Sequence, residues 1–334
     1  MSDEIVTLAH GAGGLQTREL IEKVFAKAFA GPRFTSDDAA LLGLGTDKIA
    51  LTTDGFVVSP AFFPGGDIGK LSVCGTVNDL SCMCARPRYL TCSFIIEEGF
   101  DMSSLEKIAS SMADAAREAG AEIVAGDTKV VGRGQCQGVF ITTAGVGTLE
   151  GGKTGGAFVR EGDAVIVTGD VGRQGCAILI ARGGYGIKAD IDSDCAPLWN
   201  LVKAAIDTGE EIHAVRDATR GGLATVLSEI AEQSGLCVEI DEQAVPVDEK
   251  VKGFCGLLGL DPMYMACEGR MVIFAPKNGA EKLLRAVRAT KYGAGAEIIG
   301  EVTRSLAGRV TVRTALGAKR LLAPPSGELL PRIC

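Results

Sequence analysis

The sequence lacks several features that would place it in a familiar class. No uninterrupted apolar run reaches the ~18 residues needed to span a bilayer, and the first fourteen residues begin acidic and contain no apolar signal-peptide core. We therefore expect a cytoplasmic protein that does not associate with membranes. Positive charge is also scarce, because 34 lysines and arginines stand against 42 aspartates and glutamates, a net charge of −8. Since cations that neutralise phosphates supply much of nucleic-acid affinity, we expect no nucleic-acid partner.

Histidines and nucleotide-binding motifs are equally rare. Only His10 and His213 occur, and no serine–histidine–aspartate relay is expected; we expect His213 to cap a helix or pack. No G-x-G-x-x-G motif indicates a dinucleotide site. Residues 147–154 match the Walker A pattern letter for letter, but that motif needs a helix directly after it, and GGAFVREGD has no helical pattern. We interpret this segment as a linker between domains.

The eleven cysteines do not form a disulfide pattern. Their number is odd and no export signal accompanies them, which favours reduced thiols. Cys74, Cys82, Cys84 and Cys92 lack the paired C-x₂-C spacing of a zinc site and lie in apolar segments. We expect these four side chains, like the single Trp199, to pack in the core.

Glycine, by contrast, is abundant, with 45 in 334 residues, roughly twice the usual share. Apolar periodicity predicts alternating strands and helices in both halves, with a capping box at Ser103 and Glu106. A glycine-rich stretch at 145–156 separates the halves, so we expect two domains. The predicted strands are 5–9, 48–58, 89–97, 121–131, 139–149, 164–168, 237–240, 271–275, 297–302 and 309–314, and the predicted helices are 15–30, 67–85, 103–120, 174–181, 196–208, 222–234, 250–258 and 281–289.

Several aspartates stand beside glycines or at strand ends. Each alone is typical of a turn or a cap. Asp79 is different, because its neighbours Val77 and Leu80 belong to an apolar helical stretch. Carboxylates at separate chain positions are what Mg²⁺ needs to hold a polyphosphate. The set therefore indicates metal-assisted phosphate chemistry; its members are Asp37, Asp38, Asp54, Asp79, Asp127 and Asp217.

Eight stretches spread over almost the whole chain resemble one superfamily, that of aminoimidazole-ribotide synthetase, selenophosphate synthetase and thiamine-monophosphate kinase. The long FFPGG block and the terminal PRIC are more specific than the others, and they resemble the HypE family of hydrogenase-maturation carbamoyl dehydratases. The matching stretches are LAHGAGG at 8–14, DDAA at 37–40, TTDGFVVSPAFFPGGDIGKLSVCGTVND at 52–79, PRYLTC at 87–92, AGDTKVV at 125–131, RDATRGG at 216–222, CEGRMVI at 267–273 and PRIC at 331–334.

The resemblance implies an α/β fold of the α+β type in two domains. The N-terminal domain, residues 1–150, would carry a small sheet that pairs with its twin in a homodimer. The C-terminal domain, residues 151–322, would carry a mixed sheet covered by helices, and residues 323–334 would form a tail. ATP with Mg²⁺ would lie between the domains. Carried over residue by residue, the metal ligands are Asp38 (or Asp37), Asp54, Asp79 and Asp217, and the nucleotide contacts are Thr53, Asp54, Asp79, Gly126, Asp127 and Thr128.

The resemblance gives the terminal Cys334 a chemical role. A partner carbamoyltransferase would load its thiol with a carbamoyl group, and ATP would then phosphorylate the carbamoyl oxygen. Loss of a nitrogen proton and of phosphate would leave a thiocyanate, the cyanide source for an iron-carrying complex that matures nickel–iron hydrogenase. The family points to Lys129 and Glu268 as the bases, although an ion pair between these two is an equal alternative. Arg332 is expected either to guide the tail toward phosphate or simply to solvate it.

Two other functions remain open at this point. A selenophosphate-synthetase-like kinase is expected to carry a cysteine and a lysine in its N-terminal glycine loop, where this chain reads HGAGGLQ. A non-catalytic maturation scaffold would use Cys334 for docking and would not need the carboxylates around Mg–ATP. The carboxylates and PRIC together favour the dehydratase.

Overall fold

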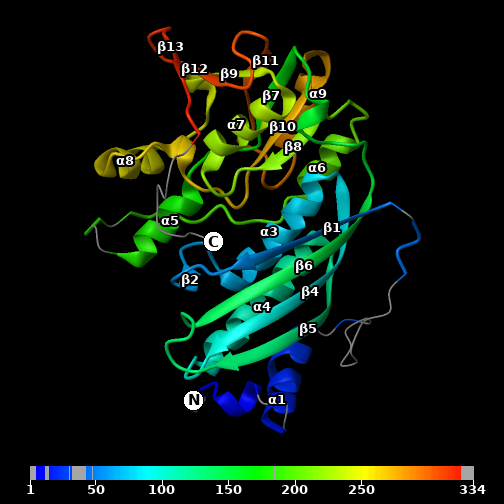
Figure 1. Ribbon diagram of the computed structural model, residues 1–334, viewed down its shortest axis with the longest axis vertical. Coiled ribbons are helices and arrows are strands. Elements are labelled where there is room, and N and C mark those ends of the chain that lie inside the picture. Colours follow the sequence, from blue (N-terminus) through cyan, green and yellow to red (C-terminus); the bar gives the residue numbers. More distant parts are fainter. Residues whose placement is uncertain are drawn as a thin grey trace.

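The computed structural model describes residues 5–11, 15–29, 31, 43–46, 48–183, 186–187 and 189–324 (Figure 1). The predictions for Asp37, Asp38, Arg332 and Cys334 lie outside the described residues. At the N-terminal end, a short 3₁₀ turn precedes a run of helix: Leu8–Gly11, then α1 (Leu15–Leu20), η2 (Ile21–Ala26) and α2 (Lys27–Phe29).

A four-stranded sheet organises the N-terminal half, in the order β1-β6-β4-β5. Strand β6 is antiparallel to both of its neighbours, whereas β4 and β5 are parallel. Helices α3 and α4 pack against one another, with α3 on β1, β6 and β4 and α4 beside β5 (Figure 1). These elements are β1 (Ile49–Phe56), α3 (Ile68–Cys82), β4 (Ala85–Glu97), α4 (Met102–Ala119), β5 (Glu122–Val131) and β6 (Val139–Leu149), with the small β2 (Phe62–Phe63) and β3 (Gly66–Asp67) before α3.

The two helices are built differently. α3 is buried on almost every side and begins at Asp67, whose carboxylate accepts hydrogen bonds from the amides of Gly69 and Lys70. α4 is amphipathic, and it ends at Gly120, which has a φ of 72° that favours glycine. The other face of the sheet exposes aliphatic side chains, including Leu51 at 76%.

A seven-stranded mixed sheet organises the second half, in the order β13-β12-β9-β11-β7-β10-β8. Successive side chains of β7 point to opposite faces of the sheet, and helices cover both faces. Ile166 packs with residues of α6 and α9, and Val165 packs with residues of α7. Helices α5 and α8 pack together at one side (Figure 1). The bounds are β7 (Asp163–Val167), α5 (Arg173–Arg182), α6 (Trp199–Ile206), β8 (Ala214–Asp217), α7 (Gly222–Ser234), β9 (Cys237–Asp241), α8 (Glu249–Leu258), β10 (Met271–Pro276), α9 (Lys277–Arg288), β11 (Glu297–Thr303), β12 (Val310–Arg313) and β13 (Lys319–Leu321).

Helix α3 joins the two halves. It packs on its own sheet and also against β8 and α6 of the second half. Trp199, at the start of α6, is buried in the core shared by both halves, as the sequence predicts. The boundary proposed after residue 150 falls in the interval between β6 and β7.

Most predicted elements are confirmed within a few residues, and the differences are of three kinds. The strand predicted at 5–9 is a single bridge from Ile5 to Asp101, followed by the 3₁₀ turn. The cap of α4 is Asp101 rather than Ser103, because the Asp101 carboxylate accepts a 2.7 Å hydrogen bond from the amide of Ser104. Strands β2, β3, β8 and β13 are absent from the prediction, because segments this short show little or no period.

The expectation that residues 147–154 are not a phosphate loop is confirmed. After β6 the chain makes a short 3₁₀ turn, Gly156–Phe158, and no helix follows. In the described residues, none of the helices has the length and hydropathy to cross a membrane.

Candidate active site

Three of the predicted aspartates gather around α3, which contacts β1 of the first sheet and β8 of the second. Asp54 lies near the end of β1, Asp79 in α3, and Asp217 at the end of β8. Each lies near enough to another to affect its ionisation: the charge of Asp54 raises the pKa of Asp79, and the charges of Asp79 and Asp54 raise the pKa of Asp217. The fold therefore brings one carboxylate from each of three elements to a single place.

A hydrogen bond and a close approach between β1 and α3 place Asp79 and Asp54. The hydroxyl of Thr52 donates a 2.8 Å hydrogen bond to Oδ2 of Asp79, which ties α3 to β1. Gly75 of α3 lies against β1, where an added Cβ would come within 2.8 Å of the Phe56 ring and 3.7 Å of Oδ2 of Asp54. Glycine at this position therefore allows the strand and the helix to approach closely.

Without a nearby cation, burial disfavours the ionised form of these three carboxyl groups. Burial is the largest cause that raises the pKa of Asp54 and of Asp79. The pKa of Asp217 rises to about 7, through burial first and the charge of Asp79 second. Cys82 has Sγ 4.0 Å from Oδ1 of Asp217, and burial and this carboxylate raise the pKa of its thiol. A nearby dication would reverse the balance for all three aspartates.

The donor set fits magnesium held together with a nucleotide. Within the described part of the chain, no group of three or more histidine, cysteine, aspartate or glutamate side chains is close enough to hold a metal ion on its own. Mg²⁺ commonly takes only one or two carboxylates and receives its other oxygens from phosphates and water. Asp54, Asp79 and Asp217 supply oxygen donors of that kind, and their mutual repulsion is what a dication relieves.

Glu268 belongs to the same place. It lies in the loop before β10 and is 4% exposed. Burial raises the pKa of its carboxyl well above the usual range, with further contributions from the charges of Cys195, Asp217, Asp194 and Asp54. A raised pKa makes the ionised carboxylate a stronger base than an ordinary glutamate.

The other residues predicted to contact the nucleotide or to act as a base lie on the two edge strands of the N-terminal sheet. Gly126, Asp127, Thr128 and Lys129 are in β5, whereas Thr53 is in β1, three strands away. Lys129 pairs with Asp127 at 2.7 Å and does not pair with Glu268 within the described chain. The ion pair between Lys129 and Glu268 that we considered from the sequence is therefore wrong for a single chain.

Some residues near the carboxylates escape the sequence analysis. The charge of Arg220 lowers the pKa of Asp54, and that of Arg216 lowers the pKa of Asp79. Both arginines stand in the segment RDATRGG, one of the stretches that carry the family resemblance, which also contains Asp217. Thr52 is also missed, although it directly precedes the predicted Thr53.

The histidine and cysteine predictions hold in the described residues. His213 is buried, and its Nδ1 lies 2.7 Å from Oδ2 of Asp163, so it packs in a hydrogen-bonded pair. The four clustered cysteines are buried. All ten cysteines in the described part of the chain are free.

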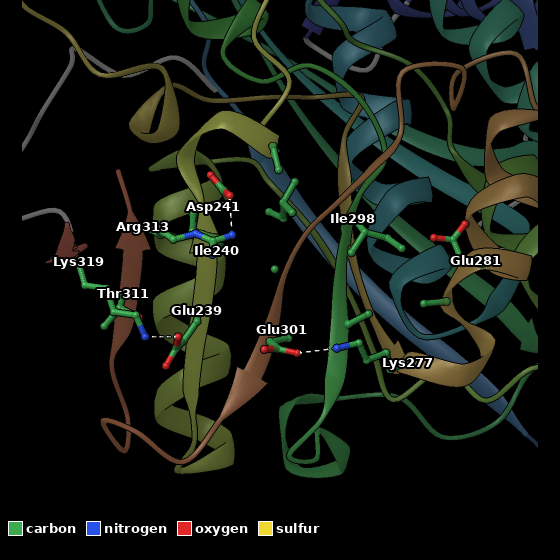
Figure 2. A pocket seen from close by; sticks show the side chains of 15 residues that line it. Glu239, Ile240, Asp241, Lys277, Glu281, Ile298, Glu301, Thr311, Arg313 and Lys319 are labelled. Carbon is green, nitrogen blue, oxygen red and sulfur yellow. Dashed lines mark hydrogen bonds and ion pairs between the residues drawn. The ribbon is translucent and has the colours of Figure 1, made fainter. Parts of the chain in front are cut away.

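A cavity of about 640 Å³ lies elsewhere, over β9, β11 and β12 (Figure 2). None of the predicted site residues lines it. Its charged side chains are largely paired with one another, as Glu239 with Lys319, Asp241 with Arg313, and Glu301 with Lys277. It therefore offers little net charge to a nucleotide.

Comparison with known proteins places this geometry in a family. The family models for AIR synthase related protein match at residues 36–149 for the N-terminal domain and 160–313 for the C-terminal domain. The carbamoyl dehydratase HypE of Rhodobacter capsulatus is 49% identical over 339 residues, which cover 100% of this chain and 99% of that protein.

Two solved structures extend the likeness to three dimensions. The hydrogenase maturation protein HypE in complex with ATP is 46% identical, with a TM-score of 0.94 over 98% of this chain and 99% of that one. A HypE–HypF complex matches with a TM-score of 0.81 and 47% identity, covering 92% of this chain and 99% of that one. The two-domain fold inferred from the sequence is thus confirmed, and the chain belongs to the HypE family of carbamoyl dehydratases in hydrogenase maturation.

Proposed function

We propose that this chain is an ATP-dependent carbamoyl dehydratase that converts an S-carbamoyl group on its own Cys334 into a thiocyanate. The cyanide so formed would go to the iron of a nickel–iron hydrogenase. The observation that carries the proposal is the gathering of Asp54, Asp79 and Asp217 beside the buried Glu268, in a chain that matches family members over its full length. A docking scaffold needs no such constellation.

The carboxylates have a binding role. Asp54, Asp79 and Asp217, together with Asp38 outside the described residues, would hold magnesium. Bound by these carboxylates, magnesium would supply positive charge to the phosphates of the nucleotide. Thr52 keeps Asp79 oriented through its 2.8 Å hydrogen bond. The start of α7, directly after Arg220, is a helix N-terminus close to the same carboxylates and is suited to stabilise a phosphoryl group.

The reaction balances without an external redox partner. The carbamoyl oxygen attacks the γ-phosphorus of ATP, and the bond from that phosphorus to the bridging oxygen breaks to release ADP. The nitrogen then loses its two protons, the carbon–oxygen bond breaks, and phosphate leaves with the former carbamoyl oxygen. A carbon–nitrogen triple bond remains on the sulfur. Phosphorylation is needed because an amide oxygen is a poor leaving group and phosphate is a good one.

We assign the proton removal to Glu268 first. It is buried near Asp217 and Asp54, and its raised pKa makes its carboxylate form a stronger base than an ordinary glutamate. Lys129 is a second candidate, but in one chain it is exposed on β5 and paired with Asp127. For Lys129 to reach the same substrate, a second copy of the chain would have to supply it.

A homodimer would bring Lys129 of one copy to the substrate bound by the other copy. The N-terminal sheet exposes Ile49, Leu51 and Ile95 on one face, with exposed fractions of 48%, 76% and 38%. Aliphatic side chains on an open sheet face are typical of a surface that another copy covers. Pairing of two such sheets would bring the β5 residues of one copy toward the β1 residues of the other, and so complete the nucleotide contacts proposed for Thr53, Gly126, Asp127 and Thr128.

Two partners follow from the chemistry. A carbamoyltransferase must load Cys334, and a relative solved in complex with a second protein, HypF, supports a loading partner. An iron-carrying maturation complex must then accept the cyanide. Both partners need access to the Cys334 thiol.

Intact mass spectrometry tests the proposal. The protein is co-produced with the carbamoyltransferase and carbamoyl phosphate, and the Cys334 peptide is weighed before and after Mg–ATP is added. A carbamoyl adduct that loses one water on ATP addition supports the dehydratase. An adduct that persists with ATP would leave a carrier or scaffold. Absence of any adduct, with the partner shown to be active, would overturn the proposal.

A further inference from the structure

The side chain of Asn78 crosses from one half of the molecule to the other. It lies in α3, one residue before Asp79, and is 2% exposed. Its Nδ2 donates hydrogen bonds to the carbonyl oxygens of Ala196, at 3.1 Å, and Glu268, at 3.3 Å. Its Oδ1 accepts a 2.8 Å hydrogen bond from the amide of Leu198. Asn78 therefore holds the carbonyl group of the residue that we assign as the base.

The side chain of Asp194 holds the amide side of the same segment. Its Oδ1 accepts from the amide of Glu268 at 3.3 Å, and its Oδ2 accepts from the amide of Gly269 at 3.1 Å. Oδ1 also accepts from the amide of Gln174, at the start of α5, at 3.1 Å. A buried carboxylate that receives three amides in this way is a fixed anchor for the main chain.

The main chain around Glu268 is tightly packed. A Cβ added to Gly269 would lie 1.8 Å from the carbonyl oxygen of Asp194. The loop that carries Asp194 and the turn at Glu268–Gly269 are therefore in direct main-chain contact. The amide of Ala196 also donates to the carbonyl of Glu268, at 3.4 Å.

We propose that Asn78 and Asp194 are positioning residues, which clasp the main chain of Glu268 from the two domains and set its side chain against the substrate bound by Asp79. This inference rests on the proposed function. The amide-side contact comes from the C-terminal domain and the carbonyl-side contact from α3, the helix that carries Asp79. Through this clasp, formed by the side chains of Asn78 and Asp194, the position of α3 determines the position of the main chain of Glu268. A misplacement of about 1 Å is enough to lower a rate by about 100-fold.

Loss of a positioning residue has an effect that a general loss of stability does not have. If the base is misplaced, the carbamoyl group is still phosphorylated but waits longer for the proton to be removed. Water then attacks the phosphorus, the bond from phosphorus to the carbamoyl oxygen breaks, phosphate leaves and the carbamoyl group is regenerated. ATP is consumed and no thiocyanate forms. A structural defect alone lowers the formation of ADP and of thiocyanate together, and the ratio of ADP to thiocyanate stays at one.

The experiment measures ADP and thiocyanate in parallel. Full-length protein carbamoylated on Cys334 is used, as wild type, Asn78→Ala, Asp194→Asn and Glu268→Gln. Asp194→Asn is included because it retains an acceptor oxygen and nearly the same shape, in case the alanine variant does not fold. The matched control is Thr154→Val, which removes another buried hydrogen bond to α3, from the Thr154 hydroxyl to the carbonyl of Cys82 at 2.9 Å. Melting temperatures are recorded for all variants.

The expected result is a ratio of ADP to thiocyanate near one for wild type and for Thr154→Val. For both clasp variants and for Glu268→Gln, the ratio rises several-fold and thiocyanate formation slows by about 10- to 100-fold, while the KM for ATP stays within about twofold. A folded Asn78→Ala or Asp194→Asn variant that keeps a ratio of one overturns the clasp. Full activity of Glu268→Gln overturns the clasp but leaves the dehydratase standing, whereas a wild-type chain that forms no thiocyanate overturns both.

Discussion

Thr53 and Lys129 lie on the same face of the N-terminal sheet but on its two opposite edge strands. The pairing runs from Thr53 to Ala144 on β6, then to Thr91 on β4 and Ala125 on β5, and Lys129 follows four residues later on the same side of β5. Three strand spacings separate the edges, roughly 14 Å. One chain therefore presents two separate parts of the proposed active site.

This arrangement predicts complementation between two inactive variants. We expect Asp79→Asn and Lys129→Ala each to be nearly inactive, because each removes one part of the site. When the two are denatured together and refolded, about half of the dimers are mixed, and each mixed dimer contains one intact site. Activity should then return to about a quarter of the wild-type value. Activity that stays at the level of the separate variants would show that each site is built from one chain.

Thr52→Val should weaken magnesium binding. The substitution keeps the shape of the side chain but removes the 2.8 Å hydrogen bond to Asp79. Partners that orient a metal ligand are typically worth about 10- to 100-fold in metal affinity or activity, so we expect half-maximal turnover at about tenfold more Mg²⁺. The control is Thr290→Val, which removes a hydroxyl bonded to the carbonyl of Val287 at the end of α9. Equal magnesium dependence for the two variants would contradict the role of Thr52.

The pKa of Asp217 predicts how stability responds to pH without metal. Its folded-state value of about 7 exceeds the ordinary value of 3.8, so between these values the folded protein binds more protons than the unfolded chain. The free energy of unfolding should therefore fall as pH rises from about 4 to about 7 and should level off above that. Urea titrations of the metal-free protein measure it, and Asp217→Asn should flatten this part of the profile. An unchanged profile in that variant would show that the carboxyl is not perturbed.

Cys334→Ser should abolish carbamoyl transfer while leaving ATP binding intact. The terminal thiol is the proposed acceptor, and the nucleotide contacts come from other parts of the chain. Cys136→Ser is the matched control, because Cys136 is the one cysteine among the described residues that is not buried. Carbamoylation of the Cys334→Ser protein at another cysteine would contradict the assignment.

The fold was largely predictable because its elements are long and their periods are clear. The amphipathic pattern of α4 and the alternation of β4 and β6 identify these elements from sequence alone. Strand β8 was missed because four residues carry too little pattern, and yet β8 places Asp217 beside Asp79. The cap of α4 is Asp101 rather than Ser103, because the Asp101 carboxylate accepts hydrogen bonds from both the Ser104 amide and the Ser103 hydroxyl, which leaves Ser103 inside the helix.

The site was predictable only in part, since spacing along the chain does not show which side chains meet. Asp79 was suspected because a carboxylate in an apolar helix needs a reason. Its neighbour Asn78 gave no such signal, although it spans the two domains, because a buried asparagine leaves no periodic trace. The separation of Lys129 from Glu268 depends on sheet order, which the sequence does not display.

The most direct test of the central claim follows the carbamoyl oxygen. Cys334 is loaded from carbamoyl phosphate labelled with ¹⁸O in its carbonyl group, Mg–ATP is added in unlabelled water, and the released phosphate is analysed by mass spectrometry. The account predicts one ¹⁸O atom in phosphate for each thiocyanate formed. Thiocyanate with unlabelled phosphate would contradict dehydration through a phosphorylated carbamoyl group.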